Sequence, residues 1–411
     1  MPTPSKYAVL VINSGSSSVK FTLFAIADEA VLARGVVERI GLEGTRITYS
    51  ALHGKRQDRP VAVADAREAV ACIVECLTDE THGVLENRQA VAAVGHRVVH
   101  GGEKINASVV IDAQVKKIIH EYARLAPLHN PPNLAGIEAC EENFPDSPQV
   151  AIFDTAFHAT LPEKAYLYGL PYELYTQGKI RRYGFHGTSH RYVSQAAAQY
   201  LGRPLKNLKI ITCHLGNGSS ITAVDGGRSV DTSMGLTPLE GTIMGTRCGT
   251  IDPAIVPHLM QHQNLSVDQV DALLNKKSGF LGMAGIGSSD VRDVLAAMEK
   301  GHARAAAAIH VFVHQIRKYL GAYTAAMNGL DAVVFTGGVG ENAAMVREMV
   351  CNGEGGLGVL GIQLDQDKNA SANGRACSIQ AAGSQVALLV IPTDEEKEIA
   401  RQAMALLGLS I

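Results

Sequence analysis

The tract VLVINSGSSSVKFTLFA, residues 9–25, decides the fold of this chain. An apolar run over residues 9–12 enters a polar turn at residues 13–18, and alternating apolar residues continue to residue 25. This pattern predicts two antiparallel strands joined by a tight turn. The tract KIITCHLGNGSSITAVDG, residues 209–226, repeats the plan half a chain later, again with Gly-Ser-Ser in the turn. The repetition predicts an internal duplication and two related α/β domains facing one another.

Apolar periodicity along the rest of the sequence predicts the other strands and helices of each half. In the first half they predict strands, a helix, a strand, a helix and a final strand, in that order. The second expected helix of that half ends before Pro127 and the Pro131-Pro132 pair, because proline disrupts a helix interior. The predicted strands are 31–39, 46–51, 91–99, 149–153, 208–213, 221–224, 332–335 and 385–391, and the predicted helices are 65–77, 115–125, 267–274, 303–327 and 394–407.

Composition narrows the class of protein. Apolar residues make up 46% of the 411 residues and charged residues 19%, with a formal net charge of −3. These values are typical of globular domains and argue against a protein that coats nucleic acid. Every apolar run is shorter than a membrane span, and the first one is too short for a signal sequence. The seven cysteines are spread without a C-x-x-C pair, so we expect reduced thiols in a cytoplasmic protein without nucleic-acid or membrane partners.

Three glycine- and serine-rich turns follow apolar strands, at residues 13–18, 216–220 and 336–342. Such turns expose successive backbone N–H groups that suit phosphate oxygens, and three of them favour a nucleotide ligand. The chain has no G-x-x-x-x-G-K-[ST] motif and no protein-kinase H-R-D or D-F-G set. The spacing at residues 337–340 does not fit a dinucleotide fold.

Two arginines lie among glycines. Arg97 comes late in an expected strand before Gly101-Gly102, and Arg247 lies in the loop GTIMGTRCG. Glycine neighbours leave space for a ligand, and a guanidinium fits a carboxylate or a phosphate, although a surface ion pair is the alternative. Asp154 follows the expected strand 149–153, where it could serve Mg²⁺ or cap a turn.

His186 and His190 are four residues apart, a spacing that could hold zinc on a helix. The intervening Gly-Thr-Ser favours a helix start instead, with His186 at the end of a loop and His190 in the first helical turn.

With these residues the sequence resembles the acetate kinase family of the acetate and sugar kinase/Hsp70/actin superfamily. The resemblance runs nearly end to end, through VINSGSSSVKF, GHRVVHGGE, APLHNPPNL, FDTAFH, RYGFHGTSH, CHLGNGSS, DTSMGLTPLEG, GTRCGTIDPA, SSDVRD, FTGGVGEN and TDEE. It implies an α/β fold of two duplicated RNase H-like (actin-like ATPase) domains with an interdomain active-site cleft. The implied domains are residues 1–156 plus 394–411, and a nucleotide-binding domain at residues 157–393.

The resemblance also implies an activity, reversible transfer of the ATP γ-phosphoryl group to acetate by a homodimer that uses Mg²⁺ (or Mn²⁺). Arg97 would bind acetate, Asp154 would be catalytic, and His186 and Arg247 would stabilise the migrating phosphoryl group. The acetate methyl pocket would be Val99, Leu128 and Pro238, and the metal ligands Asn13 and Glu395. The nucleotide and phosphate residues would be Asn13, Ser16, Ser18, Lys20, His214, Gly216, Asn217, Gly218, Asp290, Val291, Arg292, Gly338, Gly340 and Asn342.

The chemistry of the acceptor agrees with this division. A carboxylic acid with a pKa near ~4 is ionised at neutral pH and needs no general base, so the task is to align two anions and supply positive charge. Propionate or butyrate kinase is the alternative within the superfamily, because one methylene is worth only ~1–3 kcal/mol. An Hsp70- or actin-like switch protein is the alternative from another class. Cys248, Thr250 and Asp394 depart from residues common in the family.

Overall fold

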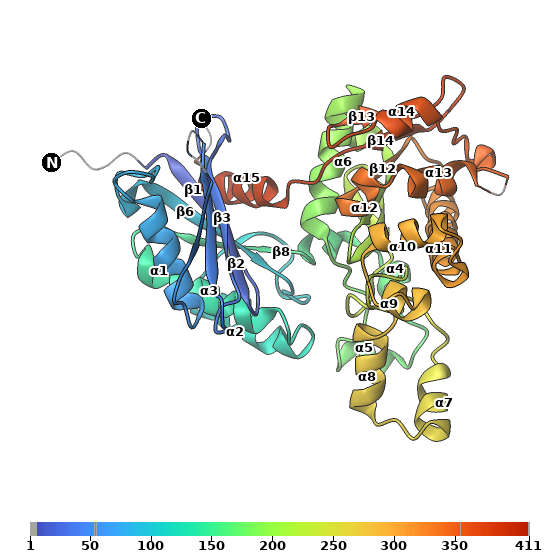
Figure 1. Cartoon of the computed structure of the whole chain (residues 1–411), viewed down its shortest axis with the longest axis horizontal. Helices are drawn as coiled ribbons and strands as arrows, with labels where there is room; N and C mark the ends of the chain where they lie inside the picture. Colours follow the sequence, from blue (N-terminus) through green and yellow to red (C-terminus); the bar gives the residue numbers. More distant parts are fainter. Residues whose placement is uncertain (1–5, 53, 55, 354, 410–411) are drawn as a thin grey trace. The chain divides into compact units, whose positions relative to one another are not determined.

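The computed structural model describes residues 6–52, 54, 56–353 and 355–409. The chain forms two compact units, one from Met1–Phe157 with Asp394–Ile411 and the other from His158–Thr393. Figure 1 shows both units, each with a sheet covered by helices. No helix of the described part of the chain has the length and apolar character needed to span a bilayer.

The first unit is built on an eight-stranded sheet of order β5-β4-β3-β2-β1-β6-β8-β7. Strands β1, β2 and β3 pair antiparallel, whereas β6 pairs parallel with both β1 and β8. The strands are β1 (Ala8–Ser14), β2 (Ser18–Ala25), β3 (Val31–Glu38), β4 (Arg46–Ala51), β5 (Gln57–Pro60), β6 (Val91–Val98), β7 (Val109–Val110) and β8 (Gln149–Phe153).

Helices cover both faces of this sheet. On one face α1 (Ala66–Leu77) and α3 (Asn130–Asn143) pack with β1 and β2, and α2 (Ala113–Glu121) lies against α3. The other face is covered by α15 (Glu395–Leu407), which arrives from the far end of the chain (Figure 1). At Gly95 of β6 a Cβ atom would lie 2.9 Å from Ile399 Cγ2, so this glycine lets α15 lie close to the strand.

The second unit repeats the plan with a six-stranded sheet of order β11-β10-β9-β12-β14-β13. Strands β9, β10 and β11 pair antiparallel, and β12 pairs parallel with β9 and β14. This is the arrangement of β1, β2, β3, β6 and β8, so the predicted duplicated α/β fold is confirmed. The strands are β9 (Lys209–Leu215), β10 (Ser219–Asp225), β11 (Arg228–Thr232), β12 (Ala332–Thr336), β13 (Cys377–Ser378) and β14 (Ala387–Val390).

Two long helices pack on this second sheet. Because side chains alternate along a strand, Ile211 and Cys213 join the core under α11 (Ala303–Met327), whereas Thr212 contacts His190 of α6 (Gly187–Leu201). The other helices are α4 (Glu163–Tyr166), α5 (Tyr172–Thr176), α7 (Ile255–His262), α8 (Val267–Lys276), α9 (Gly279–Ala284), α10 (Val291–Glu299), α12 (Gly337–Asn342), α13 (Ala344–Asn352) and α14 (Gln366–Ser371).

The preceding helix ends before Pro127 as predicted, but two local structures differ from the sequence prediction. The Pro131-Pro132 pair also opens a helix that was not predicted, α3, at the first helical positions, where proline lacks only an N–H that would be unpaired anyway. The third glycine-rich turn is the helix α12. Its first residue, Gly337, has φ 75°, so the chain turns sharply from β12 into that helix.

Candidate active site

The first unit brings three of the predicted charged residues together at one end of its parallel strands. Arg97 lies near the end of β6, Asp154 follows β8, and Glu395 is the first residue of α15. Arg97 donates from Nη2 to Asp154 Oδ2 at 2.6 Å and from Nε to Oδ1 at 3.3 Å, a two-pronged ion pair. Arg97 Nε lies 3.8 Å from Glu395 Oε2. The alternative of a surface ion pair for Arg97 is excluded, because the side chain of Asp154 is only 1% exposed.

Burial and neighbouring charges shift the pKa values of Glu395 and Arg97. Desolvation raises the pKa of Glu395 to about 7; Arg97 opposes the rise, and Asp154 and Glu396 add to it. Desolvation works to lower the pKa of Arg97, but the carboxylates of Asp154 and Glu395 outweigh it and raise that pKa further above its usual range. Perturbed groups of this kind gather at functional sites.

The turn between β1 and β2 adds polar groups to the same unit. Asn13 and Lys20 are register partners across this hairpin, and Gly15 N–H donates to Ser18 O at 2.8 Å. Lys20 acts on the Glu395 carboxyl by lowering its pKa, which links the hairpin to the Arg97 group. Ser16 is exposed and Ser18 half-buried, so both are open to a ligand.

Oxygen donors suited to a hard cation lie among these residues. The Glu395 carboxylate and the Asn13 amide oxygen are the ligand types that Mg²⁺ and Mn²⁺ prefer, so the donor set fits the predicted metal. In the described part of the chain, no group of three or more His, Cys, Asp or Glu side chains could hold a metal ion. Both ring nitrogens of His190 lie 2.7 Å from hydroxyl groups, Nδ1 from Thr212 Oγ1 and Nε2 from Ser220 Oγ, which argues against His190 as a zinc ligand.

The three residues predicted to surround the acetate methyl group do not lie in one unit. Val99 is buried, and its N–H donates to Asn133 Oδ1 at 3.2 Å. Leu128, also in the first unit, is 65% exposed. Pro238 belongs to the second unit. The methyl pocket therefore stays a prediction.

In the second unit, His186 and Arg247 meet at one glycine. A Cβ atom at Gly218 would lie 3.4 Å from His186 Nε2 and 3.6 Å from Arg247 Nη1, so both side chains border this turn. His186 precedes α6 in a left-handed conformation, with φ 56°, which is uncommon for a residue other than glycine. Such strain persists only where the surrounding structure enforces it, and it gathers at functional sites.

The loop that carries Arg247 is fixed by hydrogen bonds to its backbone. Arg247 Nη1 donates to Pro238 O at 3.2 Å, and burial lowers the pKa of its guanidinium. A Cβ atom at Gly245 would lie 1.8 Å from Asn217 Oδ1, and Gly245 N–H donates to Asn217 O at 3.0 Å. The loop therefore lies against the turn of residues 216–220.

A cavity of about 710 Å³ in the second unit is lined by seven of the fourteen predicted nucleotide and phosphate residues. Its volume falls within the range of small-molecule sites. The start of α10 forms one side, where Asp290 caps the helix and pairs with the exposed Arg292 at 2.6 Å; that side-chain contact lowers the pKa of Asp290 to about 2. The lining residues that were predicted from the sequence are Gly216, Asn217, Asp290, Val291, Arg292, Gly338 and Asn342.

The remaining predicted residues of this group border the same turns. His214 is the penultimate residue of strand β9, and its Nδ1 lies 2.8 Å from Ser189 Oγ. Its ring stacks on that of His186 at 4.3 Å between centroids. Gly340 lies within α12, where its carbonyl accepts from the buried Arg347 at 2.9 Å.

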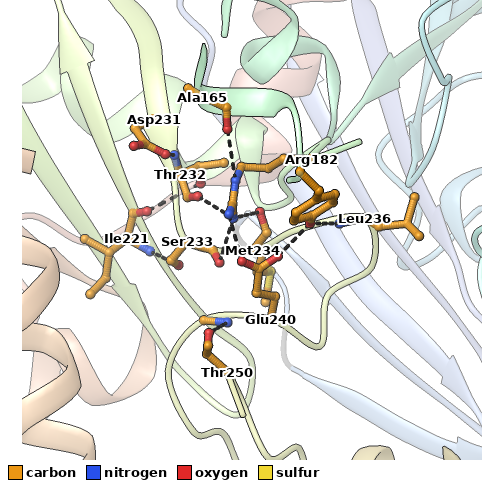
Figure 2. A network of polar contacts seen from close by, with 12 residues as sticks. Ala165, Arg182, Ile221, Asp231, Thr232, Ser233, Met234, Leu236, Glu240 and Thr250 are labelled. Carbon is orange, nitrogen blue, oxygen red and sulfur yellow. Dashed lines mark hydrogen bonds and ion pairs between the residues drawn. The ribbon is translucent and has the colours of Figure 1, made fainter. Parts of the chain in front are cut away.

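A network centred on Arg182, shown in Figure 2, supports the loop of Pro238 and Arg247. Arg182 Nη1 donates to the carbonyls of Thr232, Ser233 and Met234 at 2.9–3.2 Å, and Nη2 pairs with Glu240 Oε1 at 2.7 Å. The hydroxyl of Tyr168 donates to Glu240 Oε2 at 2.6 Å and accepts from Leu236 N–H at 2.9 Å. This network fixes the segment that precedes Arg247.

Sequence reasoning assigned no role to Arg182, Tyr168 or Glu240. Arg182 and Glu240 lie within the quoted tracts RYGFHGTSH and DTSMGLTPLEG, yet they are 58 positions apart. No spacing rule joins residues so distant. The available signal was a charged residue inside each tract that no substrate role required.

Comparison with known proteins agrees with this geometry. The family model of the acetokinase family matches residues 8–401. The chain belongs to the acetokinase family. An acetate kinase of Natranaerobius thermophilus is 51% identical over 400 residues, which cover 97% of this chain and 99% of that protein. The crystal structure of Porphyromonas gingivalis acetate kinase is similar with a TM-score of 0.92 and 44% identity, covering 98% of this chain and 100% of the other.

A second acetokinase-family structure is nearly as similar. The crystal structure of a propionate kinase from Francisella tularensis has a TM-score of 0.89 and 40% identity, over 97% of this chain and 99% of that one. Family membership shows that the protein is a kinase, with ATP and a small molecule as its substrates.

Proposed function

We propose that this protein is an acetate kinase, which transfers the γ-phosphoryl group of ATP to acetate and releases acetyl phosphate and ADP, reversibly. The observation that carries the proposal is the convergence of His186 and Arg247 on Gly218, beside a cavity of nucleotide size. Relatives named acetate kinase at 51–52% identity over nearly the whole chain support acetate as the acceptor.

The reaction needs alignment and positive charge. An acetate oxygen attacks the γ-phosphorus in line, the bond from phosphorus to the β–γ bridging oxygen breaks, and ADP leaves with that electron pair. Because acetate is already ionised at neutral pH, no proton has to be removed from it. The protein therefore has to offset the repulsion between two anions and hold them in line.

The contacts of the described residues support the roles proposed here. Arg97 uses Nε and Nη2 for Asp154, so its Nη1 edge is available to grip the acetate carboxylate. Asp154 holds that guanidinium in place, and Val99, Leu128 and Pro238 are proposed as the residues that would contact the methyl group. His186 and Arg247 donate to the oxygens of the migrating phosphoryl group, since both border the Gly218 turn.

ATP occupies the cavity of the second unit, with its phosphates toward the Gly216–Gly218 turn and the start of α12. The nucleotide- and phosphate-binding residues proposed there are His214, Gly216, Asn217, Gly218, Asp290, Val291, Arg292, Gly338, Gly340 and Asn342. In the first unit Asn13, Ser16, Ser18 and Lys20 act on the phosphates. Mg²⁺ (or Mn²⁺), held through Asn13 and Glu395, would supply charge that offsets the phosphate oxygens.

The proposed domains are residues 1–156 plus 394–411, and the nucleotide-binding domain at residues 157–393. We propose that the enzyme works as a homodimer in the cytoplasm. The seven free cysteines support a reducing compartment.

A coupled assay of ADP release tests the function. The purified protein is given ATP and Mg²⁺ with acetate, propionate, butyrate or no acceptor. ADP release that depends on acetate, with acetyl phosphate trapped as the hydroxamate, supports the proposal. Slow ATP hydrolysis that is indifferent to acceptor would instead identify a switch protein of the Hsp70 or actin type.

Propionate is the second candidate acceptor, favoured by the similarity to the Francisella tularensis propionate kinase. Discrimination between the two acids is limited, because one methylene is worth only about 1–3 kcal/mol in an apolar pocket. Val99→Ala should raise kcat/KM for propionate relative to acetate by about 10-fold, within that range. An unchanged ratio of the two kcat/KM values would remove Val99 from the pocket.

A further inference from the structure

A chain of hydrogen-bonding side chains lies behind His186 in the second unit. Thr212 Oγ1 lies 2.7 Å from His190 Nδ1, and His190 Nε2 lies 2.7 Å from Ser220 Oγ. Ser220 Oγ in turn lies 2.9 Å from His186 Nδ1. Thr212, His190 and Ser220 are all fully buried. This series of hydrogen bonds therefore ends at His186 Nδ1, and the other ring nitrogen of His186, Nε2, borders Gly218.

The distances indicate which group donates in each of these hydrogen bonds. In the described part of the chain, the other acceptor near the Thr212 hydroxyl is Thr222 O, at 3.5 Å, which is too long for a good hydrogen bond. The Thr212 hydroxyl therefore donates to His190 Nδ1. A neutral imidazole carries a single N–H, so His190 donates from Nε2 to Ser220 Oγ. Ser220 then donates its hydroxyl to His186 Nδ1, which leaves the N–H of His186 on Nε2.

Neutrality of His190 is required for this direction, and its surroundings enforce it. Desolvation in the interior lowers the pKa of His190 well below its usual value, and His158 and His214 lower it further. The His158 ring lies 5.6 Å from that of His190. A proton on His190 would place a charge among buried groups that offer no carboxylate partner in the described contacts of its ring.

The groups that face His186 also disfavour a charge on its ring. Arg247 approaches Gly218 from the same side as His186 Nε2, and His214 stacks on the His186 ring. A cationic His186 would therefore lie beside a permanent cation. The neutral ring with its N–H on Nε2 avoids this repulsion and still offers a donor at the turn.

We propose that Thr212, His190 and Ser220 are positioning residues that hold His186 as the neutral tautomer with its proton on Nε2. This inference rests on the proposed phosphoryl transfer and adds how His186 serves it. His186 donates to the phosphoryl group without first taking up a proton. Its contribution to kcat is therefore independent of pH across the range in which an ordinary imidazole titrates, near about 6.5.

The test compares the pH dependence of kcat in Ser220→Ala with that of the wild type. Without the Ser220 hydroxyl, Nδ1 is no longer held as an acceptor, and a donor on Nε2 is guaranteed only when His186 is protonated. We expect the ratio of variant to wild-type kcat to fall by about 10-fold between pH 6 and 8.5, part of the ~10²–10³-fold loss that follows removal of a complete oxyanion donor. A ratio that stays constant with pH would overturn the proposal.

Thr222→Val is the matched control. Thr222 is buried on the same strand two residues further on, but its hydroxyl contacts Thr232 and, among the described residues, no histidine. Its kcat ratio to wild type should not vary with pH, even if the variant is less stable. Thr212→Val removes the first donor of the chain and should show the pH dependence of Ser220→Ala.

A direct measurement uses the wild-type protein labelled with ¹⁵N-histidine. The His186 signals, identified by their loss in His186→Asn, should show a protonated Nε2 and an unprotonated Nδ1 at pH 7.5. The opposite tautomer in the wild type would overturn the proposal. Wild-type protein that lacks acetate-dependent ADP release refutes the proposed function itself, whereas an active wild type with the opposite tautomer refutes only this inference.

Discussion

Arg97 and Asp154 form a two-pronged ion pair across the parallel strands β6 and β8, with Nη2 and Oδ2 2.6 Å apart. The carboxylate is buried and fixed by its strand, so it sets the direction of the guanidinium rather than competing for it. The unused edge of Arg97 can meet a substrate carboxylate in one orientation.

Arg97→Ala should raise the KM for acetate by about 10–100-fold, the scale of losing a hydrogen bond to a charged group, with a smaller effect on the KM for ATP. Steady-state kinetics with each substrate varied in turn measures both. Arg46→Ala, which breaks an exposed ion pair with Asp58, serves as the control and should leave both constants unchanged. An acetate KM equal to that of the wild type would refute the assignment of Arg97.

Arg247→Ala should lower kcat by roughly 10³-fold or more, the scale of an arginine that stabilises phosphoryl transfer. The guanidinium is held by Pro238 O beside Gly218, so its loss removes charge from the turn without opening the core. Single-turnover measurements under saturating substrates isolate the chemical step. Arg203→Ala, at a half-exposed pair with Asp331, is the control for removing an arginine from the same unit. Near-normal turnover in Arg247→Ala would exclude Arg247 from the mechanism.

Tyr168→Phe should loosen the loop that carries Arg247. The lost hydroxyl leaves Glu240 without one donor and the Leu236 N–H without its acceptor, which costs about 1–3 kcal/mol in the free energy of unfolding. We expect kcat to fall several-fold while the KM for ATP is kept, because the cavity residues are not touched. Tyr172→Phe, with an exposed ring and a long contact to Glu163, is the matched control. Equal kcat values in the two variants would argue against a role for the Arg182 network.

Acid should destabilise the fold through His96. This ring is fully buried against Gln149, and desolvation lowers its pKa to about 4. The unfolded chain therefore binds a proton between pH 6.5 and 4 that the folded chain does not, so stability falls as the pH drops through that window. Urea unfolding at pH 7 and 4.5 should give a loss of about 2–3 kcal/mol from this residue.

The control for His96 removes both partners of the contact. In His96→Leu/Gln149→Leu both side chains of this contact become apolar, and only the Ser147 carbonyl, which accepts from Gln149 Nε2 at 2.9 Å, loses a donor, so the double variant should fold and lose less stability in acid than the wild type. Identical losses in the two proteins would assign the acid sensitivity to other groups.

The sequence was sufficient for those parts of the fold that depend on local patterns. The two strand–turn–strand tracts, the helix from Ala303 to Met327 and the strand from Gln149 to Phe153 lie where periodicity predicted them. Helix α3 was missed because two prolines were read as a stop rather than a start. Helix α12 was missed because glycine has a low helix propensity, which tertiary packing overrides here.

In the candidate site, too, some residues could be predicted from the sequence and others could not. Arg97 and Asp154 could be predicted because each lies at the end of a buried strand, and parallel strands bring such ends to one edge. The partners of His186 could not, since Ser220 and Thr212 appeared only as turn and strand residues. Their contact with His190 depends on α6 packing on β9, which no local pattern encodes.

Helix α15, which covers one face of the first sheet, is synthesised after the whole of the second unit. A ribosome adds all of His158–Thr393 to the chain before it adds Glu395–Leu407. Until then Val9, Val11 and Val150 of the first sheet lack the apolar residues of α15 that bury them. Nascent chains stalled before residue 395 should expose that apolar face to chaperones, and the first unit should reach its full stability only once Glu395–Leu407 have been added.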